Sequence, residues 1–170
     1  MSEFEVKPPR TSTEQLVSAL SIKAAPVSRD GGGGIPALEP CHYAAMLAGI
    51  RGDIILKRMV EQILYGKYLG RPEYVKMLGD TSYHWIASQA LMRFPSLETS
   101  GLVLRKVSRL AAECFCHDEN PSVRLAKKHG LSRGRWSSHE VIYRTLIDRL
   151  LVLEDRLADQ ANRELRACVP

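Results

Sequence analysis

Residues 123–143 read VRLAKKHGLSRGRWSSHEVIY, and this stretch predicts two helices joined by a tight turn. Ala126 lies four residues before Gly130, and glycine readily adopts the left-handed backbone conformation that turns a chain sharply. Leu131 can be buried after the turn, and Ser132 can cap the helix that follows. Two helices pack closely in this way when the first presents a small residue at the crossing, and Ala126 is such a residue.

This arrangement resembles a helix-turn-helix, in which Trp136 would anchor the second helix. In the usual docking of that motif the recognition helix begins at Ser132 and its early residues point into the major groove of DNA. Arg133 and Arg135 would then reach guanine edges, and the lysines of the preceding helix would face phosphates. The candidate DNA-binding residues are Lys127, Lys128, Ser132, Arg133, Arg135, Ser137 and Ser138, and the structural ones are Ala126, Gly130, Leu131 and Trp136. A helical hairpin that only packs is the alternative.

The charge of the chain is concentrated in the same place. Its formal net charge is +5, and residues 121–144 hold six basic residues and one acidic residue. The rest of the chain balances 18 basic residues against 18 acidic ones. Each phosphate that a basic side chain neutralises releases a condensed counterion, so the window predicts contact with a nucleic acid. A merely solvated basic surface would show the same count.

The last predicted helix continues beyond the turn with a regular apolar seam. Its members recur at alternating spacings of three and four residues: Trp136, His139, Tyr143, Leu146, Leu150, Leu153 and Leu157. This heptad pattern fits a homodimeric coiled coil through residues 136–165, or the core face of a bundle helix. Ile142 and Ile147 widen the apolar face, which slightly favours burial within one chain.

Helical periodicity also dominates the preceding part of the chain, so the sequence predicts an all-α multi-helix bundle with a C-terminal helix-turn-helix and a long final helix. Residues 42–51 and 53–69 predict one long helix or a pair broken near Gly52. Gly79 suits the end of a short helix, and Ser82 suits the cap of the next. Residues 68–91 would then form a second, weaker hairpin, which we interpret as core packing, with a degenerate second helix-turn-helix as the alternative. Later helices are expected to begin at Ser100 and at Asn120-Pro121.

The first 40 residues differ in composition from the remainder. They hold five of the nine prolines and a run of four glycines, and they carry few large apolar side chains. Such a segment buries too little surface to offset its ordering entropy, so residues 1–40 are predicted to be a flexible arm. Residues 41–170 are predicted to be an all-α DNA-binding domain. With no export signal or membrane span expected, the cytoplasm is the predicted location.

Catalytic and metal-binding patterns are weak in this sequence. Cys114, Cys116 and His117 are close together, but a Cys-x-Cys pair on a helix directs its thiols to different sides, and no second close pair follows. No phosphate-binding glycine loop, zinc-protease motif or serine-nucleophile elbow occurs. We therefore expect no metal, no cofactor and no enzymatic activity, and we expect Cys114 to be a core residue.

The segment from Leu102 to Leu165 also resembles a known family. It contains a helix ending in Cys-Phe-Cys at 114–116, the run Gly-Leu-Ser-Arg-Gly-Arg-Trp-Ser at 130–137, and a leucine-rich helix ending in Ala-Asp-Gln-Ala-Asn. This is similar to the C-terminal part of the late-gene antitermination proteins of lambdoid phages, where a Trp-Ser step also precedes the final helix.

That resemblance implies a transcription antitermination protein of a bacteriophage. Such a protein binds a DNA element at a late promoter, loads onto paused RNA polymerase that still holds its sigma factor, and lets it pass pauses and terminators. By motif, Arg133, Arg135, Trp136 and Ser137 correspond, the first two in DNA contact and Trp136 in the core. The alternatives are a repressor-like or packaging-initiation DNA-binding protein, and a helical adaptor that does not touch nucleic acid.

Overall fold

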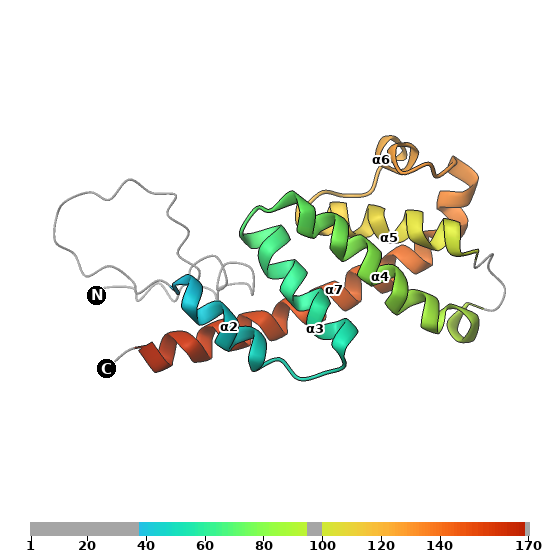
Figure 1. The fold of residues 1–170 in the computed structure, drawn as a ribbon. Coiled ribbons are helices and arrows are strands. Elements are labelled where there is room, and N and C mark those ends of the chain that lie inside the picture. Colours follow the sequence, from blue (N-terminus) through green and yellow to red (C-terminus); the bar gives the residue numbers. More distant parts are fainter. Residues whose placement is uncertain (1–37, 95–99, 169–170) are drawn as a thin grey trace, which may run out of the picture.

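The computed structural model describes residues 38–94 and 100–168, apart from the side chains of residues 90–92, 133–138 and 168. Within these ranges the chain forms six α-helices and one π-helical turn without a strand, which confirms the predicted all-α multi-helix bundle. The elements are α2 (Pro40–Ala48), α3 (Ile54–Ile63), η1 (Leu64–Tyr68), α4 (Pro72–Arg93), α5 (Gly101–Cys116), α6 (Val123–Lys128) and α7 (Arg133–Cys168). Figure 1 shows α7 running behind the other helices, from the neighbourhood of α6 to that of α2.

The core is built around the predicted apolar seam of α7. The described members of the seam are all buried: His139, Tyr143, Leu146, Leu150, Leu153 and Leu157. Helices α2, α3 and α5 each contact α7. Burying one leucine side chain contributes ~1.5–3 kcal/mol, so the seam is a principal source of stability. It is the core face of a bundle helix, and the side chain of Trp136 lies outside the described residues.

The break predicted near Gly52 separates α2 from α3. Gly52 has a φ of 143°, and the Asp53 carboxylate then accepts a hydrogen bond of 2.9 Å from the Leu56 amide. The packed body already includes Leu38, which is only 3% exposed, and α2 begins at Pro40. The body therefore begins slightly before the predicted boundary at residue 41. Residues 1–37, which carry the rest of the predicted arm, lie outside the described residues.

The predicted hairpin over residues 68–91 is wrong, because α4 continues through Gly79 and Ser82 without a break. Gly79 serves close packing instead of ending a helix. A β-carbon at this position would lie 3.1 Å from the Cα of Arg109, so the glycine lets α5 approach the α4 backbone. Ser82 is on the same face of α4, one turn further along, and is fully buried.

The predicted start of a helix at Asn120-Pro121 is also wrong by a few residues. Ser122 has an extended backbone, and its hydroxyl accepts a hydrogen bond of 3.2 Å from the Leu125 amide, which makes it the cap of α6. Asn120 and Pro121 therefore belong to the connection that precedes this cap. Ser100 precedes α5 as predicted, although its side chain makes no capping hydrogen bond.

A buried ion pair joins η1 to α7. The backbone of η1 is widened by a hydrogen bond of 3.0 Å from the Leu69 amide to the Leu64 carbonyl. Its Lys67 side chain is 6% exposed, and the ammonium lies 3.0 Å from Glu154 on α7. The Tyr68 hydroxyl donates a hydrogen bond to the same carboxylate. Lys67 also reaches Asp118, 3.0 Å away, and so connects the core to the segment that leads into α6.

Candidate nucleic-acid interface

The turn between α6 and α7 has the geometry that the sequence predicts. Gly130 has a φ of 73°, in the left-handed region. The Gly130 amide donates to the Lys127 carbonyl and the Leu131 amide donates to the Ala126 carbonyl, each over 2.9 Å. This pair of hydrogen bonds is a Schellman motif, which satisfies carbonyl groups at the end of a helix and fixes the direction of the chain that leaves it. The predicted sequence of helix, tight turn and helix is therefore confirmed.

The predicted packing of this hairpin is confirmed at the residues that are described. Ala126 and Leu131 are each 1% exposed. Helix α6 contacts both α5 and α7. A small side chain at 126 and an apolar one at 131 thus hold the hairpin against the bundle. Ser132 precedes the first residue of α7 and is exposed.

A cluster on α5 fixes the other side of the hairpin. The Glu113 carboxylate receives a hydrogen bond of 2.5 Å from Lys128 and pairs with the His129 imidazole. Burial alone would raise the pKa of Glu113, but the hydrogen bonds from Lys128 and His129 outweigh that effect, and the pKa is lowered. Lys106, two turns before Glu113 on the same face of α5, donates a hydrogen bond of 3.2 Å to the Gly130 carbonyl. We call Glu113, Lys128 and His129 the Glu113 cluster.

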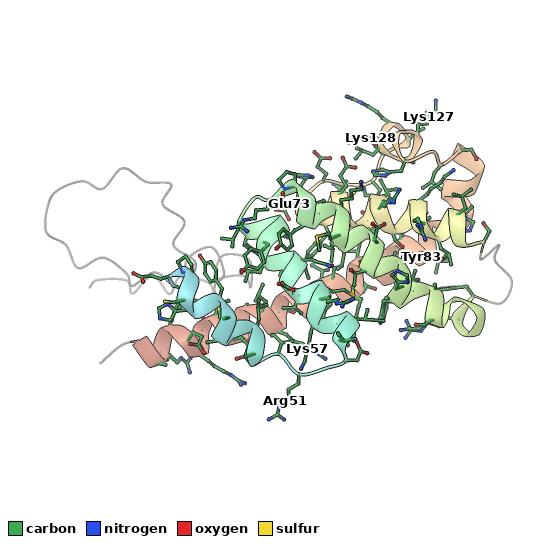
Figure 2. All side chains as sticks on the ribbon, in the orientation of Figure 1. Arg51, Lys57, Glu73, Tyr83, Lys127 and Lys128 are labelled. Carbon is green, nitrogen blue, oxygen red and sulfur yellow. The ribbon has the colours of Figure 1, made fainter. Side chains whose placement is uncertain are left out.

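The basic side chains of the 121–144 window divide into two groups. Lys128 pairs with Glu113, and Arg144 pairs with Glu140 over 2.9 Å, one turn away on α7. Within the described residues, Arg124 and Lys127 are exposed and have no acidic partner at ion-pair distance. Figure 2 shows Lys127 and Lys128 on α6, at the periphery of the bundle. Lys127 is therefore more available to a phosphate than Lys128.

The predicted base-reading residues occupy the beginning of α7. The backbone of residues 133–138 is helical and forms its first two turns. The side chains of Arg133, Arg135, Trp136, Ser137 and Ser138 lie outside the described part of the structure. Their roles in DNA contact, and that of Trp136 as the anchor of the hairpin, stay predictions.

The cysteines near the end of α5 are core residues. Cys114 is 1% exposed, as predicted, and Cys116 is 8% exposed, whereas His117 is exposed. Burial raises the pKa of the Cys116 thiol to about 12 and also raises that of Cys114, so both stay protonated at neutral pH. The thiolate is the form that binds metals. Among the described residues no group of three His, Cys, Asp or Glu is placed to hold a metal ion, and no described helix has the length and apolarity to span a membrane.

Sequence reasoning missed the residues of α5 that hold the hairpin. Lys106 and Glu113 are seven residues apart, so they share one face of α5, and together they contact the turn and the end of α6. The available signal was this spacing, combined with the opposite charge of Lys128. Neither residue carries a local motif, and only the packing of α5 against α6 brings them to the turn.

Searches against models of known protein families, curated protein sequences and solved structures find no match to this chain. The fold, the turn geometry and the distribution of charge are consequently the observations that bear on function.

Proposed function

We propose that this chain is a transcription regulator that binds double-stranded DNA through α6 and α7. The observation that supports this most strongly is the turn at Gly130. It joins a short helix to the start of a long one by a Schellman motif, with Ala126 and Leu131 buried beneath it. The same turn coincides with the densest positive charge in the sequence. A helix-turn-helix needs both a fixed hairpin and a basic exposed edge.

In this proposal the first two turns of α7 enter the major groove. Arg133 and Arg135 contact guanine edges, and Ser132, Ser137 and Ser138 contact phosphates or bases. Lys127 contacts the DNA backbone from α6, and Arg124 is a further exposed cation on that helix. Lys128 contributes less, because Glu113 already compensates its charge.

We further propose that the regulator acts as an antiterminator on bacterial RNA polymerase. The resemblance of residues 102–165 to the late-gene antitermination proteins of lambdoid phages supports this step. The buried seam of α7 bears on the oligomeric state. Since the described seam residues are covered within one chain, a homodimer through residues 136–165 would use the outer face of α7, where Val141, Leu151 and Val152 are exposed.

A gel-shift titration over a range of salt concentrations tests DNA binding directly. A DNA-binding protein loses affinity linearly on a log-log plot against salt, with a slope set by the number of phosphates neutralised. The full chain is compared with an Arg133→Ala/Arg135→Ala variant and with an Arg58→Ala/Arg166→Ala control, whose exposed arginines lie on α3 and near the end of α7. Absence of binding, or equal losses in variant and control, would favour the helical adaptor.

Polymerase binding needs a separate experiment, since a repressor-like or packaging-initiation protein would pass the gel shift. The expected result is that the full chain, retained on a column, co-purifies purified bacterial RNA polymerase holoenzyme and lengthens transcripts past a terminator in a reconstituted reaction. DNA binding without either effect would refute antitermination and leave DNA binding intact.

A further inference from the structure

A second basic site lies at the opposite end of α7 from the hairpin. The loop between α2 and α3 and the C-terminal half of α7 line an open groove of about 680 Å³. Arg51 comes from the loop, and Arg156 and Arg163 come from one face of α7, since they are seven residues apart. Buried Ile50 and Leu56 also line it and form its apolar base. We call this site the arginine groove.

The loop is fixed over α7 by contacts that place its arginine. The Gln160 side chain donates a hydrogen bond of 3.1 Å to the Gly49 carbonyl, and Arg156 donates one of 3.5 Å to the Arg51 carbonyl. A β-carbon at Gly49 would overlap the Gln160 amide, so the loop backbone lies directly against this side chain. Gln160 is between Arg156 and Arg163 in sequence and on the same side of the helix. The groove is therefore a built site instead of a chance gathering of surface arginines.

The positive charge of the arginine groove is poorly compensated. Asp159 is the acidic residue of its lining, and within the described ranges none of the three arginines has a carboxylate at ion-pair distance. The positive charge of the groove also affects Arg149, two turns before Arg156 on α7. Its pKa is lowered, first by burial and then by the positive charge of Arg156. Its Nε is buried and has no hydrogen-bond partner among the described residues.

We propose that the arginine groove binds a phosphate group of a ligand. Guanidinium groups match the oxygens of a phosphate in a bidentate geometry, and they keep their charge at any physiological pH. The lining residues that the structure describes include no aromatic ring, so they offer no platform on which a base could stack. Recognition would thus depend on the phosphate itself, carried by a small phosphate compound or by a nucleic-acid backbone.

The arginine groove is a site separate from the proposed DNA-reading hairpin. Arg133 and Arg156 are 23 residues apart on α7, which is roughly 35 Å along a helix. The major groove of DNA is about 12 Å wide, so contact between the first turns of α7 and the floor of that groove does not by itself bring Arg156 to the same base pairs. Figure 2 shows Arg51 on the opposite side of the bundle from Lys127 and Lys128. The proposal consequently goes beyond the DNA-binding function and does not depend on it.

Isothermal titration of the full chain with inorganic pyrophosphate, and separately with a mixed-sequence single-stranded oligonucleotide, tests this proposal. The groove variant is Arg51→Gln/Arg163→Gln, which keeps the hydrogen bonds of Gln160 and Arg156 that hold the loop. The control is Arg58→Gln/Arg166→Gln, which removes the same charge from exposed positions outside the groove. Since each lost charge-assisted bond weakens binding roughly tenfold, the groove variant should lose at least about tenfold and the control should lose much less.

The two ligands distinguish the sources of the phosphate. Pyrophosphate binding that the groove variant weakens supports a site for small phosphate compounds. If only oligonucleotide binding occurs and the groove variant weakens it, the ligand is the backbone of a nucleic acid. If neither ligand binds, or if variant and control lose affinity equally, the proposal is overturned. Nuclear magnetic resonance of the unmodified chain gives a second measurement. The bound ligand should shift the Gln160 side-chain amide and the Gly49 and Gly52 backbone amides, and a footprint elsewhere would also overturn it.

Discussion

The two basic regions of this molecule, the α6–α7 hairpin and the arginine groove, differ in how their charge is assembled. The positive charge of the hairpin comes from 24 consecutive residues, and part of it is compensated by ion pairs with Glu113 and Glu140. The arginine groove takes its charge from Arg51 and from residues more than 100 positions later, with Asp159 as its acidic lining residue. The first region is visible in a charge count along the chain, and the second exists only in the folded protein.

This difference shows what a local charge count can measure. Outside residues 121–144 the chain is neutral, yet α7 and the α2–α3 loop bring three arginines together, and among the described residues none of them has a carboxylate at ion-pair distance. A net charge of zero over a long stretch of sequence does not exclude a positively charged surface, because folding can bring basic residues together and place the acidic ones elsewhere. Under the two proposals above, the hairpin and the groove bind different anions at opposite ends of one helix.

The largest expected effect separates the two regions by their DNA affinity. Neutralising Lys127, Lys128, Arg133 and Arg135 removes four candidate partners of phosphates and bases. The slope of log affinity against log salt should fall by up to ~3–4 units, and the loss of guanine contacts by the two arginines should add ~1–3 kcal/mol each. Gel shifts of duplex DNA across a salt series measure both effects.

The Arg51→Gln/Arg163→Gln variant provides the comparison for that experiment. If the hairpin alone binds the duplex, this variant keeps nearly the full salt slope. An unchanged slope in a folded quadruple variant would exclude the hairpin as the DNA-binding region. An equal reduction in both variants would mean that one DNA molecule contacts both ends of α7.

A somewhat smaller effect is expected from the buried ion pair between Lys67 of η1 and Glu154 of α7. Both basic regions depend on α7, so this pair supports the helix that they share. Lys67→Met leaves the Glu154 carboxylate buried without its 3.0 Å partner. Removing one member of a buried pair costs ~3–5 kcal/mol, whereas replacing both members is often much less costly. Urea unfolding should therefore show a large loss for Lys67→Met and a partial recovery for Lys67→Met/Glu154→Gln. Glu154→Gln alone completes the cycle, and a loss in the double variant equal to the sum of the two single losses would show that the two side chains are not coupled.

Much of the fold could be predicted from periodicity, and the errors have physical causes. The α7 seam and the turn at Gly130 follow from local patterns, and both are confirmed. Gly79 and Ser82 carry the residue types of a helix end and a helix start, but Gly79 serves the close approach of α5 and Ser82 is buried within α4. Only the partner helix distinguishes these uses of a small residue.

The candidate interface could be predicted only where its residues belong to a local sequence pattern. Ala126 and Leu131 are buried as the turn pattern requires, because the motif is contained within six residues. Glu113 and Lys106 support the turn from a helix that ends before the motif begins, so no pattern within the motif indicates them. The arginine groove depends on contacts across more than 100 residues, which one sequence alone does not reveal.

The next effect tests whether the turn matters for DNA binding beyond its contribution to stability. Gly130→Ala places a β-carbon at a φ of 73°, and Gly70→Ala does so at a φ of 67° in an open position. Each substitution should cost ~1–2 kcal/mol in thermal or urea unfolding. Only Gly130→Ala also displaces the Lys106 ammonium, which lies 3.2 Å from the added carbon. Duplex affinity should therefore fall severalfold for Gly130→Ala alone, and equal affinities would show that the turn is not part of the interface.

The smallest effect distinguishes the two regions by pH. The pKa of Glu113 is lowered from its ordinary value of 4.5, because its hydrogen bonds to Lys128 and His129 favour the ionised form. The stability that the Glu113 cluster provides is thus fully present above about pH 4.5 and is lost as the pH falls through the lowered value. Guanidinium groups in general do not change their charge over this range. Acidification below 4.5 should loosen the hairpin before it affects the groove.

Glu113→Gln supplies the control for this last experiment. The variant keeps the size of the side chain but removes the charge, and a partly exposed pair of this kind contributes ~0.2–1 kcal/mol. Hydrogen exchange of the α6 amides between pH 6 and pH 3, corrected for intrinsic rates, should show protection that declines below pH 4.5 in the original chain and is uniformly lower in Glu113→Gln. The amides of residues 49–53 should show no such difference between the two proteins. If α6 protection declined in parallel in both proteins, the acid sensitivity would arise elsewhere in the bundle, and the Glu113 cluster would not be what holds α6 against α5.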